Sequence, residues 1–206
     1  MKLTYVWLTA VLYFITFLGR AEQTKITVGI EDLSYYPHYD FSNGQKAGYV
    51  LDFIKLFEKY SDYKFTFLPM PIKRLKYQFF NKQTIDLLYP FNPKWADSSE
   101  AELHLVYSPP IVGILGGTMV LKSQLGAGLN RFRYLAVPRG FTPIEWYKIR
   151  GRTKVSFIEV ANSLDALQMV IKRRADGADI EYNVAQHLMS KHNLGGNLEL
   201  DPDLPF

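Results

Sequence analysis

The sequence predicts an α/β protein with two lobes, each a small, mostly parallel sheet flanked by helices. Both halves of the chain show the same alternation of strand and helix patterns. A glycine-rich apolar stretch without helical periodicity, 111–121, separates the halves. Strands that alternate with helices along a chain usually form parallel sheets with right-handed crossovers. The chain has 206 residues, of which 48% are hydrophobic and 21% charged, enough apolar content for two small cores.

Three strand patterns and two helix patterns occupy the first half. Ile26, Val28 and Ile30 alternate with polar or small residues, as expected for a half-buried strand. Apolar residues recur at helical spacing within 48–60 and charged residues take the other side, which predicts an amphipathic helix. The remaining elements are a strand around Phe65 and Phe67, a helix starting at Pro71 and a short strand over 85–89.

The second half repeats this order after a loop at 123–130. Asn162 lies three residues before Asp165, an arrangement typical of a helix N-cap. Strands are expected at 134–137, 155–158 and 177–180, and helices from Pro143, over 164–174 and over 182–192. The expected division is a signal peptide over 1–21, lobe 1 over 22–112, a hinge over 113–122 and lobe 2 over 123–206.

The first 21 residues have the layout of a secretory signal peptide. Lys2 precedes an uncharged, mostly apolar run of 13 residues, Val6–Leu18, and small residues at Gly19 and Ala21 mark a cut before Glu22. An uncleaved anchoring helix is the alternative, but 13 residues are short against the roughly 20 needed to cross a bilayer. The sequence therefore predicts an exported protein that resides in the periplasm.

Composition and missing motifs exclude several classes of function. The chain has no cysteine, which rules out a disulfide scaffold, a thiol nucleophile and a cysteine-ligated metal. The net charge of +4 comes from scattered basic residues, so no nucleic-acid partner is expected. The P-loop, zinc-protease and nucleophile-elbow motifs are absent. His187 and His192 lie five residues apart on one expected helix, so no metal or other cofactor is predicted.

A series of short motifs runs from Lys25 to the end of the chain. In order they are Ile26–Ile30 (ITVGI), Tyr35–Pro37, Gly48–Asp52, Pro71–Arg74, Thr84–Leu87, Val106–Pro110, Ala136–Thr142 and Arg174–Glu181. This series resembles the extracytoplasmic solute-binding proteins of family 3, the bacterial periplasmic receptors of the polar-amino-acid-binding type. The resemblance implies a type II periplasmic-binding-protein-like fold that holds its ligand between two lobes and closes by hinge bending. Chains of this family return to lobe 1 after lobe 2, so we expect lobe 2 to be truncated and the return segment to be missing after Phe206.

The resemblance and the residue chemistry together suggest eight ligand-binding residues. They are Tyr35, Tyr36, Lys94, Trp95, Arg139, Gly140, Thr142 and Glu181. A tyrosine ring can stack on a cationic or apolar ligand group, or simply pack on lobe 1. Free N–H groups over 140–142 suit a carboxylate, although Thr142 is also a possible helix cap. The family usually places an acidic residue at the position of Glu181 to hold an ammonium group; the alternative role of Glu181 is to stabilise the following helix.

One departure from the family concerns the ligand's carboxylate. The family's amino-acid receptors carry a Thr-x-x-Arg-like stretch near 89–99, whose Arg binds the α-carboxylate through two hydrogen bonds. This chain has no Arg between Arg74 and Arg131 and places Lys94 and Trp95 there instead. Trp95 either lines the cleft or is buried. A ligand carboxylate would face 140–142 and either Lys94 or Arg139, so we expect a small polar or zwitterionic solute other than a standard α-amino acid bound in the usual way.

The expected function is therefore solute binding by a monomer that serves an ABC-type permease or a sensor. One alternative is a dehydratase-like enzyme on the same scaffold, for which Glu181 and His38 are the plausible acid–base residues. The other is a truncated remnant that binds nothing.

Overall fold

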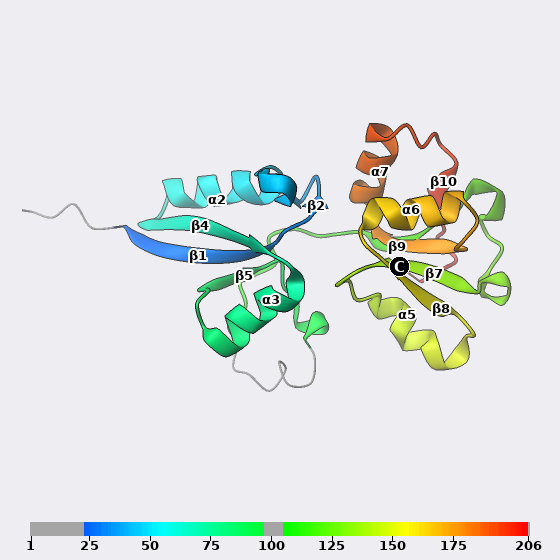
Figure 1. Cartoon of the computed structure of the whole chain (residues 1–206), viewed down its shortest axis with the longest axis horizontal. Helices are drawn as coiled ribbons and strands as arrows, with labels where there is room; N and C mark the ends of the chain where they lie inside the picture. Colours follow the sequence, from blue (N-terminus) through cyan, green and yellow to red (C-terminus); the bar gives the residue numbers. More distant parts are fainter. Residues whose placement is uncertain (1–22, 97–104, 206) are drawn as a thin grey trace, which may run out of the picture.

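The first lobe contains a three-stranded parallel sheet. A computed structural model describes residues 23–96 and 105–205 of the chain. The predicted signal peptide lies outside these residues. The strands are β1 (Thr24–Glu31), β4 (Tyr63–Met70) and β5 (Leu87–Tyr89), in the order β4-β1-β5. Helix α2 (Tyr49–Lys59) covers one face of the sheet and α3 (Ile72–Lys76) the other (Figure 1). These elements confirm the sequence prediction for the first half.

Short elements complete the first lobe and connect its strands. They are β2 (Ser34–Tyr35), β3 (Tyr39–Asp40), η1 (Ser42–Gly44), the π-helix η2 (Tyr77–Lys82) that continues α3, and η3 (Pro93–Trp95). Gly29 in the middle of β1 allows α3 to pack closely. A Cβ atom at this position would lie 2.5 Å from Leu75 Cδ1 and 2.8 Å from Ile85 Cδ1, so a larger residue would push the helix away from the sheet.

The second lobe contains a mixed five-stranded sheet in the order β10-β6-β9-β7-β8. Its strands are β6 (Gly116–Leu121), β7 (Tyr134–Pro138), β8 (Ser156–Val160), β9 (Gly177–Glu181) and β10 (Leu198–Leu200). Strands β7, β8 and β9 are parallel, whereas β6 is antiparallel to both β9 and β10. Helices α6 (Ser163–Ile171) and α7 (Tyr182–Lys191) lie on one side and α5 (Ile144–Ile149) on the other (Figure 1). Three short 3-10 helices, η4 (Lys122–Gln124), η5 (Leu129–Arg131) and η6 (Arg150–Arg152), occupy the connections.

The structure corrects the interpretation of 111–121 as one long connection and of 113–122 as a hinge. Gly116–Leu121 form strand β6 of the second sheet, and all of these residues except Gly116 are buried. A strand covered on both faces lacks the apolar–polar alternation by which strands are recognised in a sequence. The connecting segment therefore ends at residue 115. Strand β10 was also not predicted, whereas the expected cap at Asn162 is confirmed, because its Oδ1 accepts the Asp165 N–H at 2.9 Å.

The two lobes share one buried hydrophobic cluster. Tyr35, Tyr39 and Phe41 of the first lobe belong to the same cluster as Met119 and Ile180 of the second. A second cluster lies under α5, where the Trp146 indole N–H donates to the Thr118 hydroxyl at 2.9 Å. Apolar burial therefore holds the lobes against each other as well as stabilising each one. In the described parts of the chain, no helix is both long and apolar enough to cross a membrane.

Candidate functional site between the lobes

The carboxyl ends of the parallel strands in the two lobes face each other. Strand β1 ends at Glu31, just before the β2–β3 hairpin, and β9 ends at Glu181, at the start of α7. The hairpin and α7 lie at the junction of the lobes (Figure 1). Ligands of open α/β sheets bind outside the carboxyl ends of the strands. We call this junction, formed by Tyr35, Tyr36 and His38 of lobe 1 and by Phe141, Glu181 and His187 of lobe 2, the inter-lobe contact.

Both predicted tyrosines take part in this contact. The Tyr35 ring lies 5.1 Å from the Phe141 ring, and the Tyr36 ring lies 4.5 Å from that of His187. Tyr35 is buried and also packs against Tyr39 within its own lobe, whereas Tyr36 is 39% exposed. Tyr35 therefore packs on lobe 1, as one of its two expected roles requires, and also contacts lobe 2, while its stacking on a ligand stays a prediction.

Glu181 is buried, and both of its carboxylate oxygens accept hydrogen bonds from neighbouring groups. Its Oε2 accepts the Val184 N–H at 2.9 Å and its Oε1 accepts the Asn183 side-chain amide at 2.8 Å, so Glu181 is the N-cap of α7. His38 Nε2 lies 3.1 Å from Oε2, although this nitrogen makes no well-aligned hydrogen bond. Burial alone would raise the pKa of Glu181, but the contact with His38 and the two hydrogen bonds outweigh it and hold the pKa below its usual value. Glu181 is therefore a charged carboxylate that bridges the lobes.

Two further carboxylates near the contact were missed from the sequence. Glu31 is buried and accepts the Tyr39 hydroxyl at 2.7 Å; burial raises its pKa, while Tyr39 and Lys76 oppose the rise. Asp179 lies two residues before Glu181 in β9, so both side chains are on the same face of the strand. Burial raises the pKa of Asp179 to about 7. A sequence signal existed, because Asp179 and Glu181 alternate with apolar residues in a strand expected to be buried.

The charges of these carboxylates act on Tyr35. Burial is the largest cause of the raised pKa of the Tyr35 hydroxyl, and the negative charges of Glu181 and Asp179 raise this pKa further. The charge of Glu31 acts in the same direction. The inter-lobe contact thus combines aromatic rings with acidic groups from both lobes, a combination that suits a cationic or hydrogen-bonding ligand group.

The predicted residues at 139–142 lie at the edge of the contact. Arg139 is exposed, and its Nε donates to Glu159 Oε1 at 2.8 Å on the surface of lobe 2. Thr142 is exposed and does not cap α5, whose N-cap is Pro143, so the capping interpretation of Thr142 is wrong. Gly140 has a φ of 87° and faces Ile72 of lobe 1, with the position of a Cβ atom only 2.8 Å from Ile72 Cγ2.

Gly140→Ala is therefore expected to lower the free energy of unfolding by about 1–2 kcal/mol and to loosen the lobes. The added methyl group meets Ile72, and the positive φ is unfavourable for any residue with a side chain. Urea unfolding measures the first effect and small-angle scattering the second. Gly151→Ala is the control, because nothing lies within 4 Å of its Cβ position. Equal stability of the two variants would contradict close packing at Gly140.

Within the described residues, Lys94 and Trp95 make no hydrogen bond, ion pair or ring contact with the groups just described. Both belong to η3, whose N-cap Asn92 accepts the Lys94 N–H at 2.9 Å. Lys94 is exposed and Trp95 half-buried, so Trp95 is neither a fully buried plug nor a free surface ring. Within the described ranges neither residue makes an ion pair or ring contact with lobe 2. The adjoining segment 97–104 lies outside those ranges.

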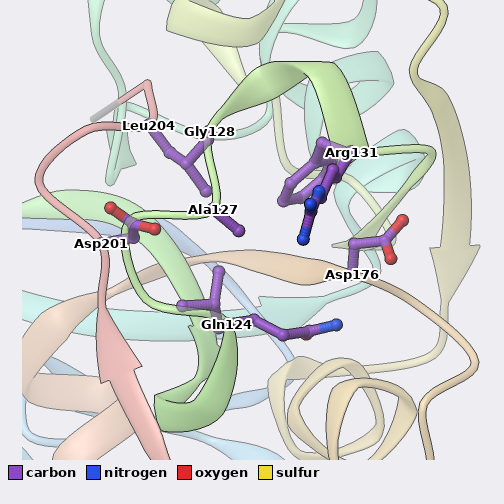
Figure 2. Close-up of a pocket in the computed structure, with 9 residues that line it drawn as sticks. Gln124, Ala127, Gly128, Arg131, Asp176, Asp201 and Leu204 are labelled. Atoms are coloured by element: carbon purple, nitrogen blue, oxygen red, sulfur yellow. The ribbon is translucent and has the colours of Figure 1, made fainter.

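A small, partly open pocket is found at the other end of lobe 2. It has a volume of about 30 Å³, enough for water but not for a solute. Figure 2 shows the Arg131 side chain projecting into it, with Asp176 and Asp201 on opposite sides. Asp176 directly precedes β9, so the cavity lies at the end of this strand opposite to Glu181. No group of three or more His, Asp or Glu side chains suited to a metal ion occurs among the residues that the structure describes.

Comparison with known proteins identifies the fold. No family model and no curated protein matches this sequence. A histidine kinase sensor domain with similarity to periplasmic binding proteins is 20% identical with a TM-score of 0.69, over 88% of this chain and 78% of that one. The periplasmic VFT2 domain of Bordetella pertussis BvgS is 16% identical with a TM-score of 0.69, over 89% and 78%. Holo ArgBP from T. maritima is 15% identical with a TM-score of 0.65, over 89% and 79%. The chain therefore has the two-lobed fold of periplasmic binding proteins.

Proposed function

We propose that this protein is an extracytoplasmic binding module that captures a small polar or zwitterionic solute between its lobes. The observation that carries the proposal is the inter-lobe contact itself. Aromatic and ionisable side chains of both lobes, Tyr35, His38, Phe141 and Glu181, meet where the carboxyl ends of two sheets converge. Similar solved structures include arginine-binding proteins and sensor domains, which supports binding of a small solute.

The cellular role that we propose is delivery of the solute to an ABC-type permease or its report to a membrane sensor. The protein would act in the periplasm as a monomer, after cleavage behind Ala21. The similar solved structures include both arginine-binding proteins and sensor domains, so they are compatible with either role.

A dehydratase-like enzyme receives less support than a binding protein. The similar solved structures are binding proteins and sensor domains. Glu181, one of the two proposed acid–base residues, holds Asn183 and Val184 through hydrogen bonds that fix the start of α7. Stoichiometric retention of a ligand without turnover would distinguish binding from catalysis.

Binding is expected to differ from that of receptors with an arginine clamp. A ligand carboxylate would rely on backbone N–H groups at 140–142 and on Lys94, which offers one point charge rather than a planar fork. In a thermal-shift screen of amino acids, amines and small carboxylates, we expect at least one class of solute to raise the melting temperature. Lys94→Ala and Trp95→Ala should reduce that shift.

Lys148→Ala is the control for this screen. Lys148 is exposed and pairs with Glu145 of its own helix, α5. Micromolar binding of several ordinary amino acids that neither Lys94→Ala nor Trp95→Ala weakens would contradict the proposed site. A lack of any shift across the whole screen would count against the proposed function itself.

A further inference from the structure

We propose that Asp179, rather than Glu181, receives the cationic group of the ligand, so that the ligand carries an ammonium or guanidinium group. This inference rests on the proposed function and specifies the solute class for the same site. It depends on three properties of Asp179. These are its place in the sheet, the absence of a hydrogen-bond or ion-pair partner for its carboxylate among the described residues, and the aromatic and polar groups near it.

The place of Asp179 follows from the strand pairing of β9. Asp179 pairs with Thr118 of β6, and it lies on the same face of β9 as Glu181, which ends the strand at the inter-lobe contact. The charge of Asp179 also acts on the Tyr35 hydroxyl, and the Tyr35 ring packs against Phe141 of lobe 2. Asp179 therefore lies beside the aromatic part of the contact, on the side of lobe 2.

The three acidic groups near the contact differ in their bonding. Glu181 accepts hydrogen bonds from Asn183 and Val184, and Glu31 accepts one from Tyr39. The backbone of Asp179 belongs to the pairing of β9 with β6, but its carboxylate has neither a hydrogen bond nor an ion pair with any residue in 23–96 or 105–205. A carboxylate that is largely removed from water and unpaired is unfavourable, and a bound cation restores the lost interaction. Of the three carboxylates, that of Asp179 would therefore be stabilised most by a bound cation.

A second group in the contact is also incompletely bonded. The His38 side chain is nine-tenths buried and its Nε2 makes no well-aligned hydrogen bond, although it lies 3.1 Å from Glu181 Oε2. Buried polar atoms of native proteins nearly always have partners. A nitrogen from lobe 1 whose one close acidic neighbour is poorly aligned for a hydrogen bond, and an unpaired carboxylate from lobe 2, indicate a site that a polar ligand completes. The adjacent ring of Tyr35 adds a favourable surface for a cation.

Matched pairs of probes that differ in charge but little in shape test the inference. The pairs are 1,4-diaminobutane with 1,4-butanediol, and L-arginine with L-citrulline, measured by isothermal titration calorimetry at pH 8. We expect the wild-type protein to bind the cation of at least one pair at least tenfold more tightly than its neutral counterpart. Asp179→Asn should abolish this preference, while Asp52→Asn, the same change at an exposed position of α2, should preserve it.

Each other outcome contradicts the inference in a recognisable way. If Asp179→Asn keeps the preference for cations, or if Glu181→Gln alone removes it, Asp179 is not the cation site and the proposed function stands. The same conclusion follows if the wild type binds neutral probes as tightly as cations. If the wild type binds neither these probes nor any solute of the wider screen, the proposed function fails and this inference fails with it. Circular dichroism at each step confirms that the variants are folded.

Discussion

Glu181→Ala is expected to lower the free energy of unfolding by roughly 3 kcal/mol. The substitution removes the N-cap of α7, which is usually worth about 1 kcal/mol. It also leaves the Asn183 amide without its acceptor and the buried His38 without its acidic neighbour. Loss of one member of a buried pair costs more than loss of an exposed pair, because the remaining group stays desolvated. Urea unfolding at pH 7 measures the difference.

Asn162→Ala provides the matched control for this experiment. Asn162 caps α6 in the same lobe through one hydrogen bond to the Asp165 N–H, but its exposed side chain makes no inter-lobe contact in the described structure. We expect it to lose about 1 kcal/mol. The excess loss in Glu181→Ala then reports the contribution of Asn183 and His38. Equal losses in the two variants would show that the His38–Glu181 contact stabilises nothing.

The effect of Glu181 also has a defined pH dependence. Its pKa is lower in the folded protein than the ordinary value of 4.5, so the folded state binds fewer protons than the unfolded state in that range. The stability that its charge contributes is complete above the unfolded pKa and is lost as the pH falls through the folded pKa. The difference between wild type and Glu181→Gln should therefore shrink in acid. A constant difference between pH 7 and pH 3 would contradict the lowered pKa.

Local patterns in the sequence predicted most of the fold. The alternation of Ile26, Val28 and Ile30 and the Asn162 cap depend on interactions between residues close in the chain, and the structure confirms both. Strand β6 was not recognised, because burial on both faces removes its alternation. Its antiparallel direction depends on pairing with β9 and β10, which are distant in the sequence.

The candidate site was predicted less completely, for a related reason. Position at a strand end suggested Glu181, but nothing in the sequence indicates that His38, far away in the chain, lies 3.1 Å from it. Arg139 was suggested as a cationic partner for a ligand carboxylate, but in the structure its side chain pairs with Glu159 at the surface. Asp179 was missed although it alternates with apolar residues as Glu181 does, because which face of the strand meets lobe 1 becomes known only when the sheet is assembled.

Asp179→Asn is expected to stabilise the protein by as much as about 4 kcal/mol at pH 8 and to change little at pH 4. Burial raises the pKa of Asp179 from 3.8 to about 7, so between these values the folded state holds a proton that the unfolded state has lost. Stability attributable to this group therefore falls as the pH rises from about 4 to 7 and is constant above. The charges that act on the same region, those of Glu181 and Glu31, are also negative and do not offset this loss. An amide of the same shape cannot ionise and avoids it.

Urea unfolding at pH 4 and pH 8, with Asp52→Asn as the exposed control, measures this gain. A loss of stability at pH 8, or an equal change at both pH values, would show that Asp179 has a partner or is well hydrated. A stabilising substitution at a site between two lobes is also informative about function, because binding residues are often retained at the expense of stability. If Asp179 receives a cation, saturating ligand should raise the stability of the wild type at pH 8 and leave Asp179→Asn nearly unchanged. The advantage of the variant should then decrease as ligand is added.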